Sequence, residues 1–184
     1  MVDLVPYLIY LPKVSLLTPL QAVRELEPQS AAPLILVADD EHLYSLVQAD
    51  QLPSEPERTF MEIRELLPPL ILIDGSTLNE GSEYLASLLL ATREYQTPGA
   101  IVTQGERSCG VLTRSVIAHI LVAEGIPLPD TRRPMGDVAI RPLRFVCRKC
   151  SPPRYAIPRQ GPPPICTERG PTGEMHGQME RVRG

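Results

Sequence analysis

The sequence predicts an α+β fold with two tandem β-α-β-β-α units at residues 1–66 and 67–125, a linker at 126–143 and a small proline-rich module at 144–184. Three observations support this division. The order of apolar strands, turns and amphipathic helices repeats within the first 125 residues. The sign of the net charge changes near residue 126, and three of the four cysteines lie beyond it.

Composition indicates a soluble globular protein. A chain of 184 residues with 43% apolar residues can bury a core. The N-terminal segment MVDLVPYLIYLPK contains Asp3 and two prolines and has no leading basic residue, so it fits neither a secretory signal nor a membrane span. We therefore expect a cytoplasmic protein that does not associate with membranes.

Charge and proline divide the chain. Residues 1–125 hold 7 Lys and Arg against 17 Asp and Glu, a net charge of −10, whereas residues 126–184 hold 11 against 5, a net charge of +6. Eleven of the 21 prolines lie in the last 59 residues, where they exclude long helices. This asymmetry fits two modules with different partners, or two halves that pack together.

The first unit is predicted to contain a strand, a helix and two more strands. Thr18 as N-cap and Pro19 at the first helical position predict a helix start. Its apolar face consists of Leu20, Val23 and Leu26. The uninterrupted apolar run LILVA predicts a buried strand, and an acidic turn leads from it into a strand at HLYSLV.

The second unit repeats that order. LILID is predicted as a strand and EGSEYLASLLLATREY as a helix, with Leu85, Leu88 and Leu89 on its inner face. GAIVTQ and SCGVLT then predict a hairpin, and residues 115–124 predict a final helix.

Two alignments of the repeat compete. PLILVADD at 33–40 is most similar to PLILIDGS at 69–76, but this match would superpose the third element of one unit on the first element of the other. Residues 33–50 align instead on residues 99–116 at a shift of 66, strand on strand and turn on turn. This alignment places Tyr44 opposite Gly110, Val47 opposite Thr113 and Asp50 opposite Val116.

The stretch AIVTQGERSCGVLTRSVI resembles the CBS domain family, whose recurring pattern ends in Gly-apolar-apolar-Thr/Ser-x-x-Asp at the start of the last helix. The second unit matches this pattern through Thr113, whereas the first unit matches it weakly. The resemblance implies a pseudo-twofold pair of units that commonly dimerises and binds adenosine-containing nucleotides in its clefts. Each unit keeps only part of the motif, because Val116 replaces the acid and the first unit retains only Asp50.

Five residues are candidates for contacts with an adenine nucleotide. Gly110 lets a ligand or a neighbouring backbone approach, and Thr113 at a helix N-terminus presents a hydroxyl to phosphate or ribose. An acid such as Asp50 would bind a ribose diol, and the backbone of Ile101 and Val102 would hold the base. Both polar residues also have a structural interpretation, Thr113 as a helix N-cap and Asp50 as a solvated turn acid.

The cysteines of the C-terminal module predict a zinc-ribbon-like site. Cys147 and Cys150 have the two-residue spacing of a metal-binding knuckle, Cys166 follows after 15 residues, and His176 follows after nine more. Three thiolates and one imidazole complete a tetrahedral site, so the zinc would be structural. The alternative is a disordered basic tail with reduced cysteines.

The sequence contains no catalytic motif of the nucleophile-elbow, phosphate-loop or zinc-protease type, so we expect a protein that is not an enzyme. The expected function is regulatory: a nucleotide, a protein partner or a second copy of the chain changes the packing of the CBS-like pair, and the zinc module contacts a partner. The alternative is a nucleic-acid-binding zinc ribbon on a CBS-like dimerisation scaffold. This alternative is less favoured, because bases stack on aromatic side chains and Tyr155 is the only aromatic residue after Phe145.

Overall fold

The computed structural model describes residues 5–25, 34–39, 42–55, 57–75, 81–104, 107–128, 144–157 and 163–182. Leu26 and most of the predicted linker, residues 129–143, lie outside these ranges.

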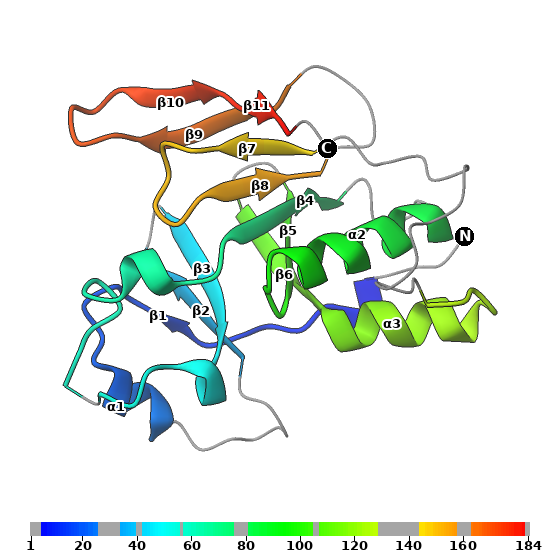
Figure 1. Ribbon diagram of the computed structural model, residues 1–184, viewed down its shortest axis with the longest axis horizontal. Helices are drawn as coiled ribbons and strands as arrows, with labels where there is room; N and C mark the ends of the chain where they lie inside the picture. Colours follow the sequence, from blue (N-terminus) through cyan, green and yellow to red (C-terminus); the bar gives the residue numbers. More distant parts are fainter. Residues whose placement is uncertain are drawn as a thin grey trace.

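The helices are α1 Leu20–Arg24, α2 Ser82–Glu94 and α3 Arg114–Ala123, with 3-10 helices η1 Val5–Tyr7, η2 Ala49–Gln51 and η3 Arg64–Leu66. The strands are β1 Lys13–Val14, β2 Leu34–Ala38, β3 Leu43–Gln48, β4 Leu70–Asp74, β5 Gly99–Gln104, β6 Arg107–Thr113, β7 Phe145–Cys147, β8 Arg154–Ala156, β9 Ile165–Arg169, β10 Met175–Gln178 and β11 Glu180–Arg181. The predicted α+β class is confirmed (Figure 1).

The same strand order occurs in both units. In the first, β1 is parallel to β2, and β2 is antiparallel to β3. In the second, β4 is parallel to β5, and β5 is antiparallel to β6. The first unit departs from prediction at its end, where the 3-10 helix η2 stands in place of a final α-helix. Pro53 follows two residues after η2, and proline cannot continue a helix.

The register of the repeat differs from the predicted one by one residue. Val37 pairs with Ser45 beside a bulge in the first hairpin, and Val102 pairs with Gly110 beside the matching bulge in the second. The structural shift is therefore 65 rather than 66. Gly110 corresponds to Ser45, Thr113 to Gln48, Val116 to Gln51, and Asp50 to Ser115.

The predicted alignment places Pro33 opposite Gly99. Gly99 is the first residue of β5, where a Cβ atom would lie 2.6 Å from the Leu112 carbonyl oxygen. Close packing against β6 requires this glycine. A slip of one residue moves every side chain to the opposite face of a strand, so the correction changes which residues are equivalent.

Apolar clusters hold each unit together and join the two. Helices α2 and α3 cover one face of the sheet that contains β4, β5 and β6, and Leu85, Leu88 and Leu89 are buried as predicted. A separate cluster joins β2 and β3 to the second sheet, and its buried members are Leu36, Ala38, Leu46, Leu70, Ile101 and Val111. The two units therefore pack sheet against sheet.

The C-terminal module continues the second unit's sheet. Strand β8 pairs in parallel with β4, and the six-stranded sheet has the order β11-β7-β8-β4-β5-β6. The β9–β10 hairpin lies beside β7 at the top of Figure 1. Tyr155 of β8 stacks on Tyr95, with ring centroids 3.9 Å apart, so this aromatic ring contributes to packing between the module and the second unit.

Candidate metal centre

The first half of the cluster is the turn between β7 and β8. Cys147 is the last residue of β7, and Cys150 follows a turn at residues 148–149. The antiparallel pairing of Cys147 with Arg154 fixes the base of this turn. The two-residue spacing therefore forms the knuckle that the sequence predicts.

The second half of the cluster comes from the β9–β10 hairpin. Cys166 of β9 pairs with Gly177 of β10, which places His176 next to the paired position. The register is irregular between Met175 and Gly177, as in a β-bulge, and Gly177 has a φ of 79°. Hairpin pairing thus closes the nine-residue gap that separates Cys166 from His176 in the sequence.

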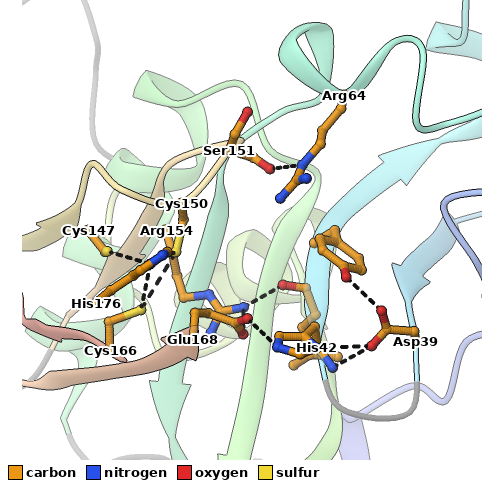
Figure 2. Close-up of polar contacts among 12 residues, drawn as sticks. Asp39, His42, Arg64, Cys147, Cys150, Ser151, Arg154, Cys166, Glu168 and His176 are labelled. Atoms are coloured by element: carbon orange, nitrogen blue, oxygen red, sulfur yellow. Dashed lines mark hydrogen bonds and ion pairs between the residues drawn. The ribbon is translucent and has the colours of Figure 1, made fainter. Parts of the chain in front are cut away.

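The four candidate ligands converge on one point (Figure 2). Their ligand atoms all lie within 4.8 Å of one another. His176 Nδ1 is 3.5 Å from the Cys147 sulfur, 3.3 Å from the Cys150 sulfur and 4.0 Å from the Cys166 sulfur. The sulfurs of Cys150 and Cys166 are 3.6 Å apart.

These four separations, 3.3–4.0 Å, lie close to the edge lengths of a tetrahedral metal site. Bonds of about 2.3 Å to sulfur and about 2.0 Å to nitrogen give tetrahedron edges of about 3.5–3.8 Å. Cys147 and Cys166 are buried, and Cys150 and His176 are half-buried. The group could therefore hold one metal ion, and three sulfurs with one nitrogen form a donor set that suits zinc.

The hydrogen bond between Cys150 and Cys166 separates the acidities of the two thiols. It lowers the pKa of Cys166 and raises the pKa of Cys150, with burial of Cys150 adding to the rise. Cys166 is thus the readier of the two to form the thiolate that binds metal.

Among the described residues, the module's own core cluster is small. Its cluster of buried residues consists of Phe145, Cys147, Cys166 and Met179, with Cys150 and Ala156 packed against it. Three of these six residues are candidate ligands, so metal binding would contribute much of the stability that a larger core would otherwise supply.

A polar network joins the metal cluster to the first unit. Glu168 lies two residues after Cys166 on β9 and forms an ion pair with Arg154 Nη2 at 2.5 Å. Its other carboxylate oxygen is 3.0 Å from His42 Nε2. Arg154 also donates to the Leu43 carbonyl oxygen at 2.6 Å. Figure 2 shows Glu168 between Arg154 and His42.

Residues around His42 complete this contact. Asp39 accepts hydrogen bonds from the His42 backbone at 2.7 Å and from the Tyr44 hydroxyl at 2.6 Å. Burial and the bond to Asp39 raise the pKa of Tyr44 to about 12, so its hydroxyl stays a donor at neutral pH. Arg64 lies 5.3 Å from the Tyr44 ring centroid and donates to the Ser151 carbonyl oxygen.

Sequence reasoning missed this network. From the sequence, Arg154 is one of several basic residues of the module, and no motif links it to Glu168 or to His42. One signal was available: residues two apart on a strand share a face, so Glu168 lies on the face of β9 that carries Cys166. Its partner in the first unit could not be predicted, because that contact depends on how the two parts pack.

Two of the predicted nucleotide contacts lie inside a sheet. Ile101 and Val102 are fully buried in β5, which pairs with β4 on one side and β6 on the other. Ile101 belongs to the cluster that joins the two units, whereas Val102 packs beneath α2 and α3.

The other three predicted nucleotide contacts take part in local structure. Gly110 has a φ of 154°, and a Cβ atom there would lie 3.0 Å from the Leu8 Cβ, so a neighbouring segment occupies the space beside it. Thr113 is the N-cap of α3 and accepts a hydrogen bond from the Val116 backbone at 3.2 Å. Asp50 is exposed on η2 and accepts a bond from the Gln48 side chain at 3.2 Å.

Comparison with known proteins gives no family model and no curated protein that matches the chain. Thirteen solved chains do match. Staphylococcus aureus OpuCA has a TM-score of 0.46 and 12% identity, over 65% of this chain and 98% of its own. The soluble part of a magnesium transporter has a TM-score of 0.43 and 15% identity, over 62% and 44%. A CBS domain-containing protein from Kribbella flavida has a TM-score of 0.39 and 18% identity, over 64% and 96%.

The helices of the described residues were also compared with the length and hydropathy that a membrane span requires. None of them is long and apolar enough to cross a bilayer.

Proposed function

We propose that this chain is a non-catalytic regulatory protein in which a CBS-like pair of units is attached to a structural zinc module. The observation that carries the proposal is the convergence of Cys147, Cys150, Cys166 and His176 at tetrahedral separations. The donor set suits zinc and provides four ligands, so the metal would have a structural role.

The repeated units support the CBS-like part of the proposal. Both have the same strand order and a matching hairpin bulge, and Gly110 to Thr113 of the second unit match the family pattern. The regulatory part rests on the module's position. It extends the second unit's sheet through β8 and contacts the first unit through Glu168, so a change in the packing of the units would reach the metal module.

Metal analysis of purified full-length chain tests the zinc site. We expect about one zinc per chain in the wild type and a loss of bound zinc in Cys147→Ser and Cys150→Ser. Cys109→Ser is the matched control, because Cys109 belongs to β6 in the second unit. For the fourth ligand, His176→Asn should weaken zinc binding, whereas His119→Asn on the exposed face of α3 should not.

A wild-type chain without zinc would refute the zinc module. If His176→Asn binds zinc as tightly as the wild type, then His176 is not a ligand and the three cysteines remain as the metal ligands. Circular dichroism of each variant separates the loss of a ligand from a global loss of fold.

An adenosine-type nucleotide in the cleft between the units remains a prediction. The corrected register weakens its basis, since the position of the family's acid is Val116 in the second unit and Gln51 in the first. Thermal stabilisation of the zinc-loaded chain by AMP, lost in Thr113→Val, would support it. Dimerisation, a protein partner and a cytoplasmic location are likewise proposed from the resemblance and the composition.

A further inference from the structure

A pocket of about 440 Å³ lies between the first unit and the metal module. The first unit contributes His42, Tyr44 and Arg64 to its lining, and the module contributes Lys149, Arg154, Glu168 and Arg169. This volume falls in the range of small-molecule sites, roughly 300–1,000 Å³. None of the five predicted nucleotide contacts lines it.

The lining is strongly cationic although the whole chain carries a net charge of −4. It includes four Lys and Arg side chains and one acid, Glu168. Glu168 is already paired with Arg154 and with His42. Asp39 contacts two lining residues but does not line the pocket itself.

Three of the cations lack a carboxylate partner within the described residues. Arg64 donates to the Ser151 carbonyl oxygen, Lys149 to the His176 carbonyl oxygen at 3.2 Å, and Arg169 to the Gly173 carbonyl oxygen at 2.9 Å. Each has further N–H groups to donate. A zinc centre with three thiolates would add one negative charge to the wall, and the lining would still carry a net charge of about +2.

We propose that this pocket binds a small phosphorylated molecule through its phosphomonoester group. Arg64 reaches the pocket from the first unit and Arg169 from the module, and the guanidinium fork matches phosphate oxygens in geometry and charge. The dianion offsets the uncompensated positive charge, and the remaining volume accommodates the organic part of the ligand. The site is distinct from the cleft between the two CBS-like units, and its lining is net positive with or without zinc on the neighbouring thiolates.

Calorimetric titration of the zinc-loaded full-length chain tests the proposal. The ligands added are inorganic phosphate, ribose 5-phosphate, AMP and adenosine, in phosphate-free buffer at low salt. Ribose 5-phosphate should bind saturably at one site per chain, and adenosine should not bind this pocket. The double variant Arg64→Gln/Arg169→Gln should weaken ribose 5-phosphate binding about 100-fold, about tenfold for each charged contact.

The matched control is Arg58→Gln/Arg148→Gln, which removes the same charge from two exposed arginines that do not line the pocket. It should leave binding within about twofold of the wild type. If Arg64→Gln lowers zinc content or thermal stability through its bond to Ser151, the single variant Arg169→Gln with Arg148→Gln as control replaces the double variants.

Three outcomes would overturn the proposal. The first is no saturable binding of ribose 5-phosphate, and the second is equal weakening in both double variants, which would indicate general electrostatic attraction. The third is AMP binding that is unaffected by Arg64→Gln/Arg169→Gln, which would place the nucleotide elsewhere and favour the cleft between the units. If a single-stranded RNA binds through Arg64 and Arg169 while ribose 5-phosphate does not, the nucleic-acid alternative replaces the small ligand.

Discussion

His42 Nε2 lies 3.0 Å from a carboxylate oxygen of Glu168, and this contact joins the first unit to the strand that carries Cys166. Glu168 is only two residues from a candidate metal ligand, so anything that orders β9 also positions the carboxylate that faces His42. The metal cluster, the cationic pocket and the first unit therefore share one strand. Four predictions test this arrangement and the local structure on which it depends.

Removal of the metal should destabilise the whole chain and not the module alone. Strand β8 is parallel to β4 in one continuous sheet, so loss of the module exposes the edge of the second unit. We expect a chelator to lower the unfolding temperature by at least about 5 °C in scanning calorimetry.

Added zinc should restore the unfolding temperature, whereas magnesium should not, because magnesium prefers oxygen ligands. An unfolding temperature that is the same with and without chelator would contradict a structural metal.

Replacement of Glu168 should cost more than replacement of an exposed acid. Glu168→Gln removes the counter-charge of Arg154, whose exposed fraction is 9%, and weakens the contact with His42. We expect a loss of roughly 1–3 kcal/mol in the free energy of unfolding measured with urea. The control Glu180→Gln disrupts an exposed pair with Arg148 and should cost less than about 0.5 kcal/mol. Equal costs would show that the network does not hold the two parts together.

Thr113 should behave as a helix cap in stability measurements. Thr113→Val removes the oxygen that accepts the Val116 backbone N–H, and we expect a loss of about 1 kcal/mol. Thr113→Ser keeps that oxygen and should restore most of the stability. If serine and valine destabilise the chain equally, then packing of the threonine methyl group explains the effect and the cap does not.

Gly110 should be intolerant of a side chain. In Gly110→Ala the new Cβ would lie 3.0 Å from the Leu8 Cβ and 3.3 Å from the Ile9 carbonyl oxygen, at a φ of 154°. We expect a loss of roughly 1–3 kcal/mol, measured by urea unfolding. Gly81 provides the control, since its φ is −64° and nothing lies within 4 Å of the position of a Cβ. Similar costs at both positions would mean that the N-terminal segment does not pack on β6.

Much of the second unit could be predicted from local sequence. The strands LILID and GAIVTQ have the predicted bounds, because an uninterrupted apolar run indicates a buried strand. The long helix places Leu85, Leu88 and Leu89 inside, as the 3.6-residue period requires. In the first unit the helix begins one residue later than predicted, with Pro19 as N-cap, because the Thr18 hydroxyl accepts a bond from the Ser15 backbone instead.

The register of the repeat could not be predicted from local sequence. Leu, Ile and Val in neighbouring positions of a buried strand satisfy either register, so only strand pairing identified the shift of 65 residues. The family pattern predicts an α-helix at the end of the first unit, where the structure has the 3-10 helix η2. Pro53 explains the difference, because proline cannot continue a helix.

Local sequence indicates which residues can form strands, helices and a metal knuckle, because apolar period, proline placement and cysteine spacing act over a few residues. The contacts between those elements follow from the folded arrangement. Pairing of β8 with β4, the approach of His176 to Cys166, and the contact of His42 with Glu168 join residues distant in the chain. Such contacts depend on the packing of whole sheets, so the pocket between the first unit and the module became visible only in the folded chain.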